Sequence, residues 1–399
     1  MANVSSSNGL EKRPRLAFRN TDGSHFPCWR QTSLGCIIEP YSEKVYGEHD
    51  YEVLTSAREG LQRQEDHFGS KQRHDTDGYN IIPFGYCTYR NRSDDGKFAF
   101  NINTISEKAI VSKFYPVFRF TNANSTFMAE FLNSSPRVKK KLSVLAVGTS
   151  QVVLSFEALK AAKFDLPCKD EQYKIAAFLE CLNARIENQR TLVVALKKYK
   201  RGVVDGIFSR KLNFSYPQTW AELEISELFM PISDKGYSDK IVLTIVQGEG
   251  TMPRDSVDRR IAYDKSTISS YKRVLPNDFI LHLRSFEGGL EIVNEEGVVS
   301  PAYTILRARN EIIPLFFYTF FRSYWFINSK LRISVEGIRD GKSINMNTFW
   351  HIKVPVPSIE EQRHISALIS SIDNRIKIAE FEYKRLLQIR VGLMQQLFI

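Results

Sequence analysis

The sequence predicts an α+β protein with an internal duplication, in which two mixed α/β domains alternate with two long helices. Its length of 399 residues suits two to four domains, and 43% apolar residues are enough for packed cores. A segment of about forty residues recurs later in the chain, and both copies carry helical apolar spacing. We expect a flexible N-terminal tail over 1–20, domains over 21–168 and 211–357, and helices over 169–210 and 358–399.

The repeat relates segment 167–208 to segment 357–398 without a gap, at a constant offset of 190 residues. The identities are spread along the whole segment, which makes chance a poor explanation. They include Glu171-Gln172 with Glu361-Gln362, Arg185-Ile186 with Arg375-Ile376, and Phe208 with Phe398.

Both copies place apolar residues at alternating spacings of four and three, which is typical of a helix that packs one narrow seam against another helix. Lys200 and Arg390 interrupt this seam at equivalent positions. A basic residue there either fixes the register of the pair or extends its charged end to the wet edge, and both interpretations stay open. The predicted helix-pairing residues are Ile175, Leu179, Leu182, Ile186, Val193 and Leu196, with Ile365, Ile369, Ile372, Ile376, Tyr383 and Leu386.

The net charge of +10 and the pI near 9.2 favour an acidic partner such as nucleic acid, although a merely basic, soluble protein has the same charge. The cysteines show no C-x-x-C pairing, so we expect no disulfide framework and no metal site. The first twenty residues lack the apolar core of a secretory signal. The apolar run 312–321 is about half the length that a membrane span needs. We therefore expect a cytoplasmic protein without membrane contact.

No motif for chemistry stands out. The stretch Gly337–Ser343 resembles a phosphate loop, but it has three residues between its glycines where a P-loop needs four. We recognise no glycine-rich loop for S-adenosylmethionine, no amino-methylation motif and no nuclease pattern. We therefore predict no catalytic residue and no cofactor-binding site. Two alternatives stay open: a solitary methyltransferase or nuclease with an unrecognised motif, and a coiled-coil scaffold that binds only protein.

Basic, polar loops are the candidate DNA-binding segments, because Arg, Gln, Ser and Thr side chains reach phosphates and base edges. One loop follows the apolar stretch at Val53, and the other occupies the corresponding place in the second half. A denser basic run, Arg137 with Lys139–Lys141, is either a phosphate-contacting or a solvated surface. The candidates are Arg58, Arg63, Gln64, Lys71, Gln72, Arg73 and His74 in the first half, and Arg254, Arg259, Arg260, Lys265, Ser266, Thr267, Ser269, Ser270 and Lys272 in the second.

The stretch from Trp350 to Ile365, followed by 372–376, strongly resembles the conserved region of Type I restriction-modification specificity subunits, the HsdS family. Segment 165–172 is a degenerate first copy, and Gly297–Tyr303 resembles a strand motif of the family's target-recognition domains. The chain departs from the family pattern at Cys168–Asp170, where a second proline and apolar residues are more usual. That departure bears on the local turn only.

The resemblance implies that the two long helices pack antiparallel, with a pseudo-twofold relation between the halves. Each target-recognition domain would read one half of a split, asymmetric double-stranded DNA site, and the helices would set the spacing. Expected partners are two modification subunits, which carry S-adenosylmethionine and methylate adenine N6, and two ATP- and Mg-dependent restriction subunits. The chain itself would be a non-catalytic subunit of this phage-defence complex.

Overall fold

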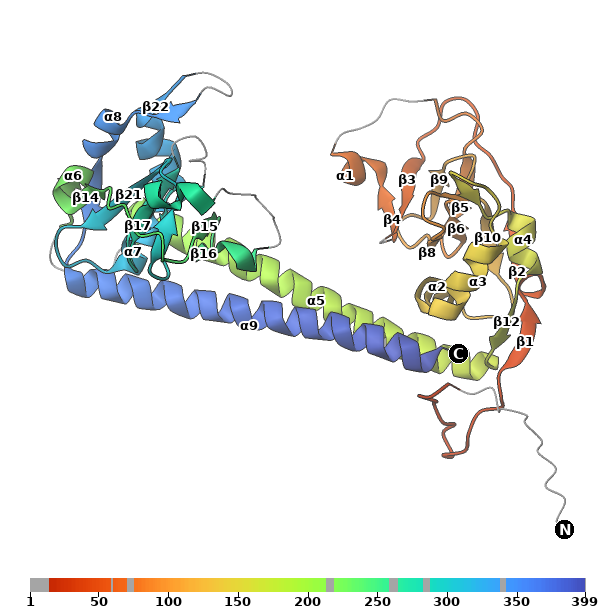
Figure 1. The fold of residues 1–399 in the computed structure, drawn as a ribbon. Helices are drawn as coiled ribbons and strands as arrows, with labels where there is room; N and C mark the ends of the chain where they lie inside the picture. The colour runs from red at the N-terminus through yellow and green to blue at the C-terminus, as the bar shows by residue number, and fades with distance from the viewer. Residues whose placement is uncertain are drawn as a thin grey trace, which may run out of the picture. The chain divides into compact units, whose positions relative to one another are not determined.

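The computed structural model describes residues 14–58, 60–69, 75–212, 219–257, 265–282, 288–337 and 342–398. The chain forms two compact units: the first comprises 1–190 and 381–399, and the second comprises 191–380. The boundaries fall inside the two long helices, α5 (Lys169–Phe208) and α9 (Ile359–Leu397). Each unit therefore contains one α/β domain and one half of each helix (Figure 1), which confirms the predicted fold class.

The α/β domain of the first unit holds two four-stranded sheets. One has the order β2 (Ile38–Tyr41), β10 (Val117–Phe120), β6 (Cys87–Tyr89), β8 (Phe100–Ile102) and is antiparallel. The other has the order β4 (Gly60–Arg63), β3 (Glu52–Ala57), β9 (Lys108–Val111), β5 (Asn80–Pro83), with β3 and β9 parallel. The remaining pairs are β1 (Arg30–Ser33) with β12 (Lys163–Leu166) and β7 (Arg92–Ser93) with β11 (Val152–Val153). The helices are α1 (Gln64–Phe68), α2 (Ser125–Ser134), α3 (Pro136–Leu145) and α4 (Phe156–Ala161), with a 3-10 turn at Leu34–Cys36.

The second unit repeats the main sheet in the order β14 (Phe229–Ile232), β21 (Tyr303–Ala308), β18 (Phe279–His282), β19 (Glu291–Ile292). Two-stranded pairs are β13 (Ala221–Glu224) with β24 (Lys353–Val356), β15 (Leu243–Val246) with β16 (Gly250–Pro253), β17 (Lys272–Val274) with β20 (Gly297–Val299), and β22 (Val335–Glu336) with β23 (Ser343–Ile344). The helices are α6 (Ile225–Leu228), α7 (Pro314–Phe321) and α8 (Met346–Trp350), with short turns at Arg254–Ser256, Lys265–Ser270, Phe326–Lys330 and Leu331–Ser334. Strand for strand, β14, β21, β18 and β19 occupy the places of β2, β10, β6 and β8, so the duplication extends to the domains.

The apolar run 312–321 contains helix α7 of the second unit. Pro314 begins the helix, where its missing N–H costs nothing. Phe316, Phe317, Phe320 and Phe321 are fully buried in the core of the second unit. Among the described residues, no helix is long and apolar enough to cross a membrane.

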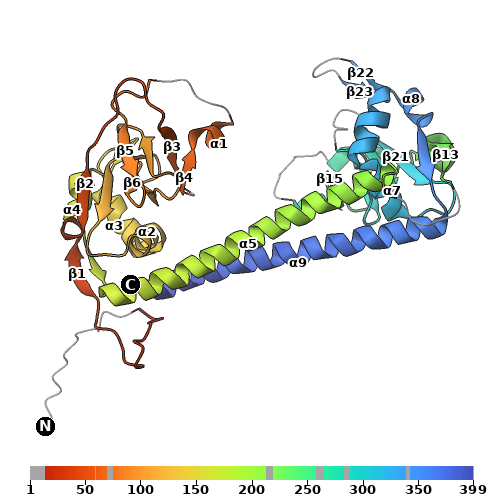
Figure 2. The same ribbon diagram turned by 180° about the vertical axis from the view of Figure 1, so that it is seen from behind.

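The predicted seam residues of α5 and α9 are all buried or half-buried, while most residues between them are exposed. In the first unit Ile175 and Leu179 share a core with Met394 and Leu397. In the second unit Leu196 shares a core with the isoleucines of the first half of α9. Within each unit the halves of α5 and α9 lie side by side in both ribbon views (Figures 1 and 2). The buried residues are Ile175, Leu179, Leu196, Ile365, Ile369, Ile372 and Ile376, and the half-buried ones are Leu182, Ile186, Val193, Tyr383 and Leu386.

Cys168 precedes α5 at the position where Ser358 precedes α9, so the two helices have different capping side chains but the same first turn. The Gln172 N–H donates to the Cys168 carbonyl at 3.0 Å, and the Gln362 N–H donates to the Ser358 carbonyl at 2.9 Å. The Ser358 hydroxyl additionally accepts the Glu361 N–H at 3.2 Å. A thiol is a weaker acceptor than a hydroxyl, so the two helices begin alike with caps of different strength.

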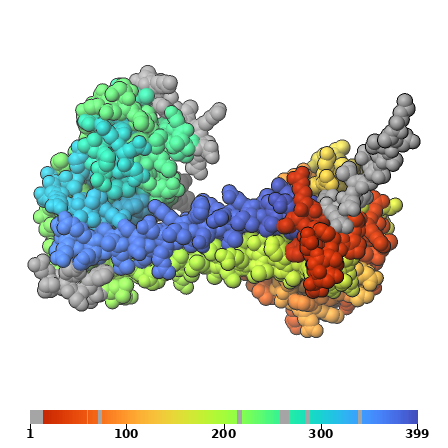
Figure 3. Space-filling view, turned by 90° about the horizontal axis from the view of Figure 1, so that it is seen from below, coloured from red at the N-terminus to blue at the C-terminus, as the bar shows by residue number. Residues whose placement is uncertain are grey.

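Residues 14–20, which the sequence assigns to a tail, contact the helices of the first unit. The Leu16 N–H donates to the Gln396 carbonyl at 3.0 Å, and the Lys174 ammonium donates to the Arg19 carbonyl at 2.7 Å. Phe18 packs edge-on against Phe178. This N-terminal stretch, in red, covers the blue end of α9 in the space-filling view (Figure 3).

Candidate nucleic-acid interface

The repeated glutamines fasten the start of each long helix to the domain that precedes it. The Gln172 amide donates to the Pro167 carbonyl at 3.0 Å and accepts the Asn124 N–H at 2.9 Å, just before α2. The Gln362 amide donates to the Pro357 carbonyl at 3.0 Å and accepts the Ile313 N–H at 3.0 Å, just before α7. Both glutamines are buried. Their role is to position the domain, and DNA contact is not available to them.

The repeated phenylalanines anchor the end of each long helix in a core. Phe208, at the end of α5, packs against Phe316 and Phe320 of α7, with ring centroids 5.6 and 5.0 Å apart. Phe398 occupies the same place after α9 and packs against Phe127 and Phe131 of α2, at 5.9 and 5.5 Å. In each unit, therefore, one helix is fixed at its start and the other at its end.

The two basic seam residues each have partners on the facing helix. The Lys200 ammonium lies 2.6 Å from the Asp373 carboxylate in the second unit. In the first unit the Arg390 guanidinium donates to the Asn183 amide oxygen at 2.9 Å. Lys200 and Arg390 are 190 residues apart, and so are Asn183 and Asp373. The two contacts therefore join equivalent positions of the duplicated helices. These matched contacts favour the interpretation that the basic residues fix the register of the pair.

The first group of predicted DNA-binding residues lies around the β3–β4 hairpin. Arg58 forms the turn, is 69% exposed and pairs with Asp95 at 2.8 Å. Arg63 ends β4 and pairs with Glu52 at 2.7 Å, and the half-buried Gln64 begins α1. Lys71, Gln72, Arg73 and His74 lie outside the described residues.

The second group lies on short turns that follow β16. Arg254 begins the turn after β16 and is half-buried, and Lys265 and Ser266 begin the turn before β17. Thr267, Ser269 and Ser270 are exposed. Arg259 and Arg260 lie outside the described residues.

Lys272 has a structural contact that the sequence does not reveal. Its ammonium donates to the Tyr303 carbonyl at 2.6 Å and so links β17 to the start of β21. Burial, with a smaller contribution from Lys235, lowers the pKa of Lys272. The ammonium is thus partly engaged within the domain.

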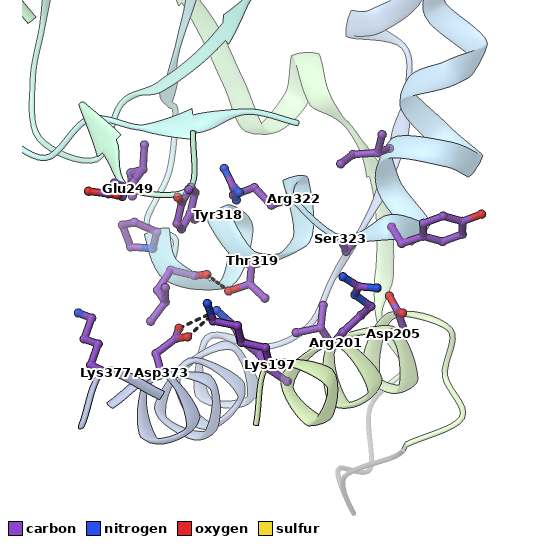
Figure 4. A pocket seen from close by; sticks show the side chains of 18 of the residues that line it. Lys197, Arg201, Asp205, Glu249, Tyr318, Thr319, Arg322, Ser323, Asp373 and Lys377 are labelled. Carbon is purple, nitrogen blue, oxygen red and sulfur yellow. Dashed lines mark hydrogen bonds and ion pairs between the residues drawn. The ribbon is translucent and has the colours of Figure 1, made fainter. Parts of the chain in front are cut away.

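A cavity of about 1400 Å³ lies in the second unit between the helix pair and α7 (Figure 4). Its charges are largely paired: Lys200 with Asp373, and Lys197 with Glu380 at 2.7 Å. Arg322 pairs with the buried Glu291, which also accepts the Tyr318 hydroxyl at 2.9 Å. Burial raises the pKa of Tyr318 to about 12. The charges that line the cavity therefore nearly balance, and no group of three His, Cys, Asp or Glu in the described chain could hold a metal ion.

A smaller cavity of about 420 Å³ in the first unit has a different character. Arg58, Lys97, Lys139 and Arg390 line it, with Glu130 as the one carboxylate of the lining. The sequence predicts Arg58 as a DNA-binding residue and places Lys139 in a basic run. It gives no signal at Lys97 and only a seam position at Arg390. Nothing in the local pattern joins these positions, because they come from a hairpin, a loop and two helices.

Three solved structures are similar to the chain over nearly its whole length. The Type I restriction-modification S subunit from M. genitalium matches with a TM-score of 0.54 and 18% identity, over 97% of this chain and 99% of that chain. A structure described as the basis of complex assembly and conformational transition of the type I R-M system matches with a TM-score of 0.57 and 16% identity, over 93% and 97%. The HsdS subunit from Thermoanaerobacter tengcongensis matches with 0.50 and 16%, over 93% and 96%. At these identities the likeness is one of fold.

Curated relatives from Methanocaldococcus jannaschii are similar over about half of the chain. The putative type I restriction enzyme MjaX specificity subunit is 24% identical over 224 residues, 52% of this chain and 51% of the relative. The type I restriction enzyme MjaVIII specificity subunit is 24% identical over 215 residues, 52% and 47%. The chain thus spans about half the length of the curated relatives it matches.

The family model described as Type I restriction modification DNA specificity domain matches the chain twice, over residues 40–196 and 217–388. Each match contains most of one α/β domain and most of the long helix that follows it. The two matches together cover well over half of the 399 residues. The chain belongs to the family of Type I restriction-modification DNA specificity domains.

Proposed function

We propose that the chain is the DNA-reading specificity subunit of a Type I restriction-modification system and recognises a split, asymmetric site. The observation that carries the proposal is a duplicated scaffold with unlike loops. The glutamine contacts, the basic seam contacts and the main sheet recur in both units. The segments that follow the equivalent hairpins differ in form: helix α1 follows β4, whereas the short turns Arg254–Ser256 and Lys265–Ser270 follow β16. One scaffold with two different readers is what two unlike half-sites require.

The chemistry of the two loop groups fits DNA. Arginine and glutamine side chains bond to guanine and adenine edges, and serine and threonine hydroxyls bond to bases or phosphates. The net charge of +10 adds a sequence-independent attraction to the backbone. Methylation and cleavage would be the work of partner subunits that carry S-adenosylmethionine and ATP with Mg. The chain alone, incubated with DNA and S-adenosylmethionine or magnesium, is expected to give no product.

The long helices would set the spacer between the half-sites. The 40 residues of α5 make a helix about 60 Å long at about 1.5 Å per residue. Half-site spacing in DNA generally mirrors the geometry of the protein that reads it. Lengthening the helices should therefore lengthen the unread spacer and leave both half-site sequences unchanged.

We predict that one heptad inserted in each helix, after Arg190 in α5 and after Glu380 in α9, lengthens the spacer by up to about three base pairs. Seven residues add about 10 Å, and a base pair occupies about 3.4 Å. These sites preserve the Lys200–Asp373 and Asn183–Arg390 contacts, because each contact lies within one unit. Methylome sequencing of a host that carries the variant and the modification subunit measures the spacer.

An insertion in α5 alone is the comparison. It shifts the register, so the two seam contacts cannot both persist, and we expect less methylation than from the matched pair. An unchanged spacer in the double insertion would contradict the ruler. Methylation of one uninterrupted sequence by the unaltered complex would contradict split-site recognition.

Exposed apolar side chains on the helices support the docking of two identical modification subunits. Tyr199 on α5 is 53% exposed, and Ile389, its equivalent on α9, is 42% exposed. Single exposed apolar residues are common on protein surfaces, but their recurrence at equivalent positions of both copies favours a repeated protein contact. One of the similar structures is described as the basis of complex assembly of the type I R-M system, which is consistent with such partners.

We predict that Tyr199→Asp and Ile389→Asp each release one modification subunit, and that the double variant releases both. A buried, unpaired carboxylate at a protein interface costs several kcal/mol, which is enough to abolish a micromolar contact. Native mass spectrometry of the purified complex counts the subunits. Tyr199→Phe and Ile389→Leu are the matched controls and should keep both. Retention of two subunits by the double aspartate variant would exclude this surface.

A further inference from the structure

We propose that the cavity of about 420 Å³ in the first unit binds one phosphate group of the DNA backbone through Lys139, Lys97 and Arg58. The proposal rests on the proposed function, since it assigns a DNA contact to a cavity that shares only Arg58 with the predicted DNA-binding loops.

Four separate segments bring their cations to this cavity. Arg58 comes from the β3–β4 turn, Lys97 from the loop before β8, Lys139 from α3 and Arg390 from α9. Such a convergence of cations costs free energy in the absence of an anion, because like charges repel at short range.

The carboxylates at this cavity are already occupied. Glu130 accepts the Asn183 amide at 2.9 Å and the Arg390 guanidinium at 2.6 Å. Asp95, beside the cavity, pairs with both Arg58 at 2.8 Å and Lys97 at 3.5 Å. Two carboxylates therefore serve four cations, and Lys139 forms no ion pair within the described chain.

The titration of Lys139 agrees with this excess of positive charge. Burial, and then the charges of Lys97 and Arg390, lower the pKa of Lys139. A bound anion would oppose that repulsion and stabilise the charged form. The group that fits best is an anion with several acceptor oxygens.

Phosphate fits the cavity better than a base edge does. A guanine edge also presents acceptors, but it carries no net charge, whereas a phosphate group carries a negative charge that offsets the excess of cations at this cavity. The amide of Asn133 is also engaged, since it exchanges hydrogen bonds with the backbone of Phe100. The cavity would then hold the backbone in place without reading sequence.

The second unit offers a natural comparison. Its cavity is lined by five cations, but the pairs Lys197–Glu380, Lys200–Asp373 and Arg322–Glu291 neutralise most of them. We therefore expect the backbone contact in the first unit alone. One half-site would be held by an extra phosphate contact that the other lacks.

The test compares Lys139→Gln with Lys140→Gln in the complex with modification subunits. Lys140 is the next residue on α3, carries the same charge and is exposed like Lys139, but it does not line the cavity. Loss of one phosphate contact reduces the slope of log K against log salt by about 0.9, and affinity near 0.15 M salt by about fivefold. We expect this for Lys139→Gln on cognate and unrelated DNA alike, with the methylated sequence unchanged. Lys97→Gln should act in the same way.

Several outcomes would overturn the site. One is an equal salt slope for the Lys139 and Lys140 variants. Another is loss of the modification subunits from the Lys139 variant, which would make the occupant an acidic protein surface. A third outcome combines two results. Inorganic phosphate stabilises the unaltered protein but not the Lys139→Gln variant, and yet the dependence of DNA affinity on salt is the same for both. If the unaltered complex shows no salt-sensitive DNA binding, the proposed function itself fails.

Discussion

Replacing Gln362 by alanine is expected to lower the free energy of unfolding of the second unit by about 2–4 kcal/mol. The change removes a buried hydrogen bond to the Pro357 carbonyl and a part-buried one from the Ile313 N–H. Each buried polar group left without a partner costs about 1–3 kcal/mol. Urea unfolding of the whole chain, followed by tryptophan fluorescence, measures the effect, since three of the four tryptophans lie in 191–380.

The duplication supplies the matched experiment. Gln172→Ala should destabilise the first unit by a similar amount, because Gln172 makes the equivalent pair of hydrogen bonds. Gln388→Ala is the control, as that glutamine is exposed on α9. A Gln362→Ala variant as stable as Gln388→Ala would show that the repeated glutamine does not fasten the helix to its domain.

Replacing Asp278 by alanine is expected to lower the free energy of unfolding of the second unit by about 3–5 kcal/mol. Asp278 is buried before β18 and accepts both ends of the Arg307 guanidinium fork, at 2.7 and 2.6 Å. It also accepts the Leu275 N–H at 2.8 Å. Removing the carboxylate leaves a partly buried guanidinium without its counter-charge.

Arg307→Lys is the informative companion variant. A lysine keeps the charge but cannot make the two parallel hydrogen bonds, so we expect a loss smaller than that of Asp278→Ala. The same urea experiment measures it. A loss below 1 kcal/mol for Asp278→Ala would mean that water or rearrangement replaces the pair.

The sequence was sufficient for the duplication, the two long helices and their apolar seam. These features are local and periodic: Ile175 and Leu179, or Ile365 and Ile369, reveal a helical face by spacing alone. The offset of 190 residues also identified Gln172 and Gln362 as equivalent. What those glutamines do was not visible, because their partners are backbone groups of the preceding domain.

The surroundings of the predicted DNA-binding residues were not visible in the sequence. Residue type and loop position predict both Arg58 and Lys272, but Arg58 is largely exposed, whereas the Lys272 ammonium donates to the Tyr303 carbonyl of β21. Residue type states what a side chain is able to bind, while its neighbours decide whether it is available. Those neighbours are contributed by distant segments.

The sequence by itself determined the order of domain, helix, domain, helix and the family to which the chain belongs, because repeats and helical periods are read along the chain. Only the tertiary structure decided that each compact unit takes half of each helix. It also decided that Arg58, Lys97, Lys139 and Arg390 share one cavity. Residues 58 and 390 lie at opposite ends of the chain, and contacts over such a separation leave no local pattern to read.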